Sequence, residues 1–201
     1  MKKRAFPKLL LLLLCLVLLL SSCGSYWRTV ALLERELSVY ENRFQQVAAA
    51  HQLEWNVMYR TKDYSEFYKA TMYSNYYEAK RSKTEYIKIR TSGAAYAKKV
   101  NSPRFTVAYI LPREKNKEFD TALFVDLVNC AAEVVLTLDF CNEFIAAPEA
   151  EYSDKDNEPP DSLSHKAYYY KPYLLDGPML ILREYEDCWK LIFLDQMRKL
   201  Q

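Results

Sequence analysis

Glycine is scarce in this chain, with 3 residues among 201. Gly24, Gly93 and Gly177 stand far apart, and none belongs to a glycine-rich motif. Loops that hold phosphate groups and tight two-residue hairpins depend on glycine, because they need positive φ angles or a close approach of the backbone. The composition therefore argues against a nucleotide site of the Rossmann or P-loop type.

Histidine is also scarce, and motifs built on cysteine and histidine are absent. His51 and His165 are the two histidines, and neither lies in a recognisable nucleophile elbow or metal motif. A Ser-His-Asp or Cys-His active site would have to use one of them. No CxxC pair or cysteine–histidine spacing indicates zinc. We therefore predict no cofactor and no metal ion.

An apolar run opens the chain but is short for a membrane-spanning helix. Four basic residues lie among the first eight, and the run covers residues 9–20. A transmembrane helix needs about 20 apolar residues to cross about 30 Å of hydrocarbon. The pattern therefore predicts a signal peptide. The alternative is a simple N-terminal membrane helix followed by a chance cysteine.

The run closes on Leu20-Ser21-Ser22-Cys23. This order of an aliphatic residue, two small residues and a cysteine resembles the lipobox of bacterial lipoprotein precursors. The resemblance implies that residues 1–22 are removed and that Cys23 carries a diacylglycerol with acyl chains such as palmitate. Such chains contribute about 0.8 kcal/mol per buried methylene. It also implies a location on the cell membrane or outer membrane, facing the extracytoplasmic side.

The rest of the chain is long enough for one domain. Removing residues 1–22 leaves 179 residues, with 24 Lys and Arg against 26 Asp and Glu. A chain of this length buries a sizeable core. We predict a lipid-anchor tether at residues 23–25 and a single α+β domain over residues 26–201.

Residues 26–51 have the periodicity of an amphipathic helix. Their apolar residues recur every three or four positions, as in a heptad stripe. The stripe consists of Tyr26, Val30, Leu33, Leu37, Tyr40, Phe44, Val47 and His51. Such a stripe either binds a helix of an envelope protein partner or packs on its own domain, and we favour the second. Because the tether is short and Tyr26-Trp27 favour a membrane interface, we expect the domain to lie close to the lipid.

The next segments predict strands and helices in alternation. Alternating apolar residues predict a strand at 53–59, and Asp63 with Glu66 resembles a capping pair that opens a tyrosine-rich helix to about Lys80. Strands follow at 84–91 and 105–111, separated by a break at Ser92-Gly93 and a helical turn at 94–99.

The second half predicts a central helix and a strand meander. Residues 121–146 are apolar nearly all round, follow Asp120 as N-cap, and predict a long helix in the centre of the fold. Strands are expected at 166–170, 179–185 and 188–194. The expected α+β fold packs the long N-terminal helix and the central helix on a mostly antiparallel sheet.

Charge is unevenly distributed along the chain. Residues 80–118 carry a net charge of +8, whereas 119–146 and 147–164 carry −5 each. The basic segment would attract anionic lipid headgroups if it formed one face, or it is a solvated face partly neutralised by the acidic segment. We expect 147–164 to be an exposed acidic loop. We predict no nucleic-acid partner, because an exported lipoprotein rarely meets one.

Three cysteines follow Cys23. Cys130 and Cys141 fall on the predicted central helix, and 11 residues of helix span about 16 Å, which is beyond disulfide reach. Cys188 could therefore pair with one of them at most. A single disulfide and three reduced thiols both fit the sequence.

Clustered tyrosines and acidic residues supply candidate binding groups. Tyrosine rings with a hydroxyl stack on sugars or anchor protein partners at low entropic cost. Asn129 with Glu133, and Asp139 with Glu143, lie one helical turn apart and could hold a cation, although such pairs are more often solvated. The candidate surface comprises Tyr73, Tyr76, Tyr77, Tyr168, Tyr170 and Glu133.

Three hypotheses follow for the function. The first is a non-enzymatic envelope lipoprotein that binds a protein or assembles with one. The second is a small-ligand sensor or carrier with a pocket between the central helix and the sheet. The third, which the sequence supports least, is a hydrolase that uses His165 with a carboxylate.

Overall fold

The computed structural model describes residues 6–132, 134–151, 161–170 and 177–195. Its helices are α1 (Phe6–Ala50), α2 (Thr121–Asn129) and α3 (Leu138–Ala146), with short turns η1 (Arg113–Lys115) and η2 (Glu149–Glu151). Its strands are β1 (Glu54–Ser65), β2 (Ala70–Lys80), β3 (Tyr86–Ala95), β4 (Val100–Pro112), β5 (Ser164–Tyr169), β6 (Met179–Glu184) and β7 (Cys188–Leu194).

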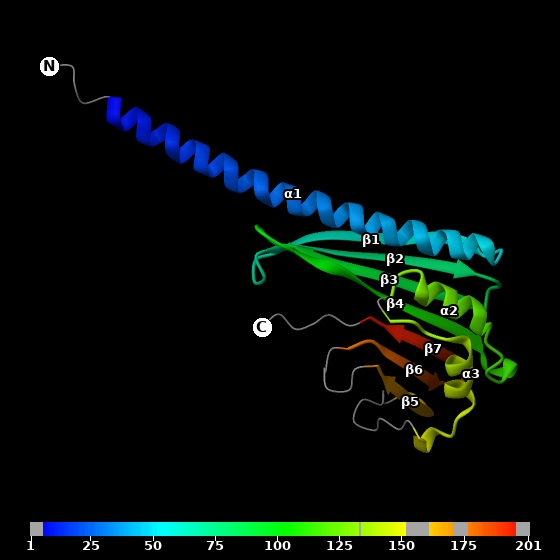
Figure 1. Ribbon diagram of the computed structural model, residues 1–201. Coiled ribbons are helices and arrows are strands. Elements are labelled where there is room, and N and C mark those ends of the chain that lie inside the picture. Colours follow the sequence, from blue (N-terminus) through cyan, green and yellow to red (C-terminus); the bar gives the residue numbers. More distant parts are fainter. Residues whose placement is uncertain (1–5, 133, 152–160, 171–176, 196–201) are drawn as a thin grey trace.

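The described strands form one antiparallel sheet of seven strands in the order β1-β2-β3-β4-β7-β6-β5 (Figure 1). The sheet and helices confirm the α+β class, and β5, β6 and β7 form the expected C-terminal meander. Phe44 of α1, Phe124 of α2 and Phe144 of α3 share one buried cluster with Val107 and Phe193 of the sheet. The three helices therefore cover the same face of the sheet.

The long helix α1 lies across this face, and its N-terminal part extends beyond the sheet (Figure 1). Val30, Leu33, Leu37 and Phe44 of the heptad stripe are all buried. The stripe therefore packs on its own domain, and these residues are not exposed to a partner helix. None of the described helices has both the length and the apolar character needed to cross a membrane.

Strand β3 runs through Gly93, where the sequence predicted a break. A β-carbon built on Gly93 would lie 2.6 Å from Cδ1 of Leu33, so α1 sits directly on the glycine backbone. The break and the helical turn at 94–99 were wrong, because glycine here allows a close approach of helix and strand. A register shift between Ser92 and Ala94 marks the same place.

The tyrosine-rich helix expected after Asp63 is instead the end of β1, a turn at 66–69 and β2. Along β2, alternate residues are buried, including Tyr73, Asn75 and Tyr77. This period of two is that of a strand, and tyrosine and threonine fit a pleated, half-buried surface. Pairing with β1 and β3 on both sides then outweighs the local capping signal.

The predicted central helix is divided into α2 and α3, so a single long helix over 121–146 was wrong. Asp120 caps α2 as expected, accepting a hydrogen bond from the Leu123 N–H at 3.0 Å. The Asn129 side chain then donates to the Leu136 carbonyl at 2.7 Å and accepts from its N–H at 2.8 Å. These two bonds satisfy the backbone N–H and carbonyl of Leu136, which lies outside either helix and so makes no helical hydrogen bonds there.

The acidic segment is described only in part. η2 and the start of β5 lie within it, whereas residues 152–160, at its centre, fall outside the described residues.

Candidate interaction surface

A polar groove of about 410 Å³ lies between α1 and the edge of the sheet. Two similar triads lie along it, each made of a glutamate from α1, a tyrosine from β2 and a cation from β1. Glu34 accepts hydrogen bonds from Lys62 and the Tyr73 hydroxyl, both at 2.8 Å. Glu41 accepts from Arg60 at 2.6 Å and from the Tyr77 hydroxyl at 3.0 Å.

The triads are internally neutralised. The bonds from Lys62 and then Tyr73 hold the pKa of Glu34 below its usual value. Burial, followed by the nearby Glu41 charge, raises the pKa of Tyr77. Glu34 is therefore ionised near neutral pH, and the Tyr77 hydroxyl is protonated. The hydrogen bonds and ion pairs of both triads connect α1 to β1 and β2.

These contacts change the interpretation of the first tyrosine cluster. Tyr73 is 6% exposed and Tyr77 is 1% exposed, and both rings lie on the helix-covered face. Placing them on a binding surface was wrong, because the alternation of β2 turns every second tyrosine into the core. Tyr76, between them, points to the opposite face.

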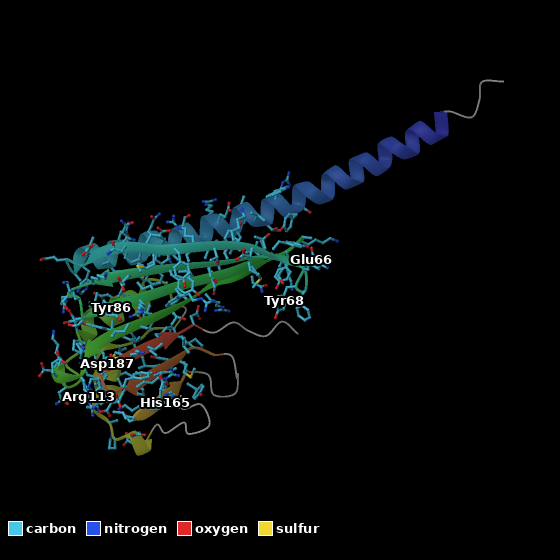
Figure 2. The ribbon with its side chains drawn as sticks, turned by 180° about the vertical axis from the view of Figure 1, so that it is seen from behind. Glu66, Tyr68, Tyr86, Arg113, His165 and Asp187 are labelled. Carbon is cyan, nitrogen blue, oxygen red and sulfur yellow. The ribbon has the colours of Figure 1, made fainter. Side chains whose placement is uncertain are left out.

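That opposite face of β1–β4 carries an aromatic and cationic patch, which we name the outer strip. The rings of Tyr59 and Tyr76 stack with centroids 4.2 Å apart, and the Arg90 guanidinium lies 5.2 Å from the Tyr76 centroid. Arg90 also donates to the Ser74 hydroxyl at 3.3 Å. The described helices pack on the other face, since their buried residues cluster with Tyr77 and Ile89, the neighbours of Tyr76 and Arg90 along β2 and β3. Figure 2 views the molecule from behind, opposite to Figure 1.

The outer strip has the composition of a protein-binding surface. Tyrosine and arginine are the residues most enriched at interface positions that carry binding energy. Tyr59 is 53% exposed, and Arg90 is exposed beside it. The stack and the cation–π contact hold these side chains in place before binding, which lowers the entropic cost of association.

The second tyrosine cluster belongs to the helix-covered face. The Tyr168 ring lies 4.8 Å from Phe140 of α3 and 5.1 Å from Tyr170, which lies 6.0 Å from Phe193. These half-buried rings extend the core instead of forming a separate surface. Glu133, the last member of the predicted set, lies outside the described residues.

A buried charge cluster, not foreseen from the sequence, closes the end of the sheet farthest from the N-terminus. Glu85 is 3% exposed and accepts from the Tyr109 hydroxyl at 2.5 Å, from Lys115, and from Arg81 at 3.4 Å. Arg81 also binds Asp120 at 2.7 Å. Burial acts to raise the pKa of Glu85, but the bonds from Lys115 and Tyr109 outweigh it and lower that pKa.

This cluster bears on the hypothesis that the basic segment, residues 80–118, forms one face that attracts anionic lipids. Arg81 and Lys115 of the basic segment are neutralised by it, and Arg104 and Arg113 of the same segment pair with Asp195 and Glu184. The segment therefore does not form one free basic face.

Lys166 is a second buried ion, 4% exposed. Its ammonium donates to the carbonyl oxygens that end α3: those of Phe144, Ile145 at 3.1 Å and Ala147 at 2.7 Å. Burial lowers the pKa of Lys166 to about 8. A cation at a helix C-terminus satisfies orphan carbonyls and complements the helix dipole.

The two histidines lie in different surroundings. His51 Nε2 lies 2.9 Å from Asp126 Oδ2 and joins the end of α1 to α2. His165 is 3% exposed, and its Nδ1 accepts a hydrogen bond from Arg183 Nε at 3.1 Å. A ring so buried is closed to substrate, which argues against a hydrolase that uses His165.

The three cysteines of the domain are free thiols. Burial raises the pKa of both Cys130 and Cys141 to about 12 and that of Cys188 to about 11. All three are therefore protonated and unreactive near neutral pH. Among the described residues, no group of three or more His, Cys, Asp or Glu side chains comes together to hold a metal ion. Asp139 and Glu143 are exposed on α3.

Comparison of the chain with protein-family models, with curated proteins and with solved structures found no match.

Proposed function

We propose that this protein is a lipid-anchored extracytoplasmic lipoprotein that acts as a non-enzymatic binding or assembly module of the cell envelope. The outer strip is its binding surface for a protein partner. The lipobox-like residues before Cys23 supply the anchor. The stacked tyrosines and the arginine of the outer strip, which are held in place before any partner arrives, support a role in binding.

One observation supports this proposal above the others: the domain begins directly after Cys23. The Ser25 hydroxyl donates to the Ala97 carbonyl at 3.2 Å, and the Thr29 hydroxyl donates to the Tyr96 carbonyl at 2.6 Å. Two helical residues rise only about 3 Å. A domain fastened so close to its anchor presents the outer strip at a nearly constant height above the lipid.

The anchor is tested by metabolic labelling with an alkyne-bearing palmitate. We expect Cys23→Ala to lose the label and to leave the membrane fraction. Cys15→Ala, in the same N-terminal segment, is the matched control and should keep both. Labelling of the Cys23→Ala variant equal to that of the parent would refute the lipid anchor.

The binding surface is tested by crosslinking in cells followed by affinity capture and mass spectrometry. We expect recurrent envelope proteins with the parent chain and their loss with Tyr59→Ser combined with Arg90→Ala. Tyr64→Ser is the control, since Tyr64 is equally exposed on the same strand but pairs with Thr71 on the helix-covered side. Equal capture by both variants would contradict a role for the outer strip.

The groove between α1 and β1 supports a second candidate, a small-ligand carrier. Its volume of about 410 Å³ is within the range of ligand sites. Its charges are already paired, however, so a ligand would have to displace Lys62 from Glu34 or Arg60 from Glu41. A sugar, lipid or metal that raises the melting temperature of the parent, but not of Glu41→Gln, would favour this function.

A further inference from the structure

Two turns lie side by side at the end of the sheet nearest the N-terminal segment. One covers residues 66–69, between β1 and β2, and the other covers residues 96–99, between β3 and β4. Thr71 pairs with Ala95, and Ala95 pairs with Val100, which brings the turns to the same end. Figure 2 shows Glu66 and Tyr68 there. We name this end, with residues 27 and 28 of α1, the tip.

The tip lies beside the predicted lipid attachment. Ser25 and Thr29 donate to the carbonyls of Ala97 and Tyr96 in the second turn, and the Tyr26 hydroxyl pairs with that of Thr71 at the start of β2. The helix continues without interruption back through residue 23. Figure 1 shows the β1–β2 turn reaching along α1 to the region where the helix leaves the sheet.

The tip exposes large aromatic side chains. Phe67 is 87% exposed, Trp27 is 62% exposed and Tyr68 is 55% exposed. The rings of Phe67 and Tyr68 meet edge to face at 4.8 Å. An exposed group of this size marks an interaction site, and tryptophan and tyrosine are the residues that collect at membrane–water interfaces.

The charge of the tip is positive. Arg28 follows Trp27, Lys69 follows Tyr68, and Lys98 and Lys99 belong to the second turn; all four are exposed. The acidic side chains nearest to them in the chain are Glu66, which binds Lys69 at 2.6 Å, and Asp63 near the end of β1. A basic group near a membrane surface gains about 1 kcal/mol from anionic lipids.

We propose that the tip is a second membrane contact, which inserts Phe67 among the headgroups of a bilayer containing anionic lipids. Trp27 and Tyr68 then lie at the headgroup level, and Arg28, Lys98 and Lys99 meet lipid phosphates. This proposal builds on the proposed lipid anchor, which would hold the tip at the membrane surface. Two contacts, an acyl chain and the tip, prevent the domain from tilting and fix the direction in which the outer strip faces.

The test uses residues 24–201, which lack Cys23 and therefore any acyl chain. The buried core of the described residues begins at Thr29, so this chain retains it. Binding is measured by co-sedimentation with vesicles of phosphatidylglycerol and phosphatidylethanolamine, and with vesicles of phosphatidylcholine alone. We expect binding to the anionic vesicles that weakens in high salt, and weaker binding to phosphatidylcholine.

Tip variants identify the contact. Phe67→Ser should weaken binding to anionic vesicles about tenfold, the factor expected when one large apolar side chain is lost from an apolar surface. Lys98→Ala with Lys99→Ala should weaken it by a similar factor and reduce the salt dependence. Val135→Ser, at a residue 76% exposed elsewhere, is the matched control. Because Phe67 is exposed, its replacement should leave the urea midpoint unchanged.

The outcomes separate this proposal from the lipid anchor. If the parent chain does not bind anionic vesicles, or if Phe67→Ser binds as well as the parent, the tip is not a membrane contact, whatever the result of palmitate labelling. If Cys23→Ala keeps its label but tip-dependent binding is found, the lipid anchor fails and the tip contact stands.

Discussion

The close packing of α1 on β3 makes a quantitative prediction at Gly93. Replacing Gly93 with alanine places a β-carbon 2.6 Å from Cδ1 of Leu33 and 3.4 Å from its Cγ. Leu33 is 0% exposed, so its side chain cannot move into solvent. Overpacking of this kind costs about 1–3 kcal/mol.

A second effect opposes the first. Gly93 does not have a positive φ angle, so alanine suits its backbone and removes conformational freedom from the unfolded chain. That change alone would stabilise the fold by about 0.4–1 kcal/mol. The overpacking cost less this gain spans about 0–2.6 kcal/mol, and we therefore expect Gly93→Ala to lower the free energy of unfolding by about 1.3 kcal/mol, the middle of that range.

The cause of the loss is tested by a double-mutant cycle with Leu33→Ala. That variant alone should lose about 2–5 kcal/mol, because it leaves a cavity beneath α1. It also removes the atoms that an alanine at 93 would meet. In the Leu33→Ala background, Gly93→Ala should therefore cost nothing or stabilise the fold, a coupling well above the 0.5 kcal/mol or so seen between independent sites.

The measurement is urea unfolding of residues 24–201 followed by circular dichroism. Ser92→Ala, one residue earlier and on the opposite face of β3, is the control and should change the free energy of unfolding by less than about 0.5 kcal/mol. Two substitutions whose effects simply add would refute the proposed contact between α1 and β3.

Three buried groups give further predictions. Glu85→Gln should lose about 1–3 kcal/mol at pH 7, because Lys115 keeps an uncompensated charge. The pKa of Glu85 is lowered by folding, so its stabilisation is present above the unfolded value of about 4.5 and lost as the pH falls further. The gap between the urea midpoints of parent and variant should therefore narrow as the pH falls below about 4.5 and through the lowered pKa of Glu85, and a gap that does not change with pH would contradict this. For Lys166, the pKa falls from 10.5 to about 8 on folding, so the unfolded chain binds more protons between these values. The parent should therefore gain stability over Lys166→Met as the pH rises from 8 to 10, and a difference independent of pH would overturn the assignment. Finally, the buried Tyr170 hydroxyl has no hydrogen-bond partner among the described residues. Tyr170→Phe should be neutral or stabilising by up to about 2 kcal/mol in thermal unfolding, and a loss of stability would reveal a missing partner.

The sequence was most informative where the pattern was local. The stripe of residues 26–51 predicted both the helix and its buried face, because apolar residues that recur every three or four positions over many turns fall on one side of a helix. The strands at 179–185 and 188–194 were equally readable, since each is a short apolar run next to a turn. The lipobox-like segment at Leu20–Cys23 remains a prediction of the sequence.

Other features depended on partners distant in the chain. Residues 70–80 had a capping signal in front of them, yet they form a strand because β1 and β3 supply hydrogen bonds on both sides. The break after Asn129 depends on two bonds between its side chain and Leu136, which periodicity does not encode. Burial of Glu85 likewise required η1 and β4 to close over it.

The sequence by itself determined the class of the fold, the helix over residues 26–51 and the candidate anchor at Cys23. Each of these follows from a pattern of residues that are close together in the sequence. Only the tertiary structure decided which tyrosines are core and which are surface, since a shift of one residue in a strand exchanges its two faces. It also decided that Trp27, Phe67 and Lys98, which come from three separate segments, share one end of the molecule. Contacts between such segments are set by strand pairing and helix packing, which no local pattern specifies.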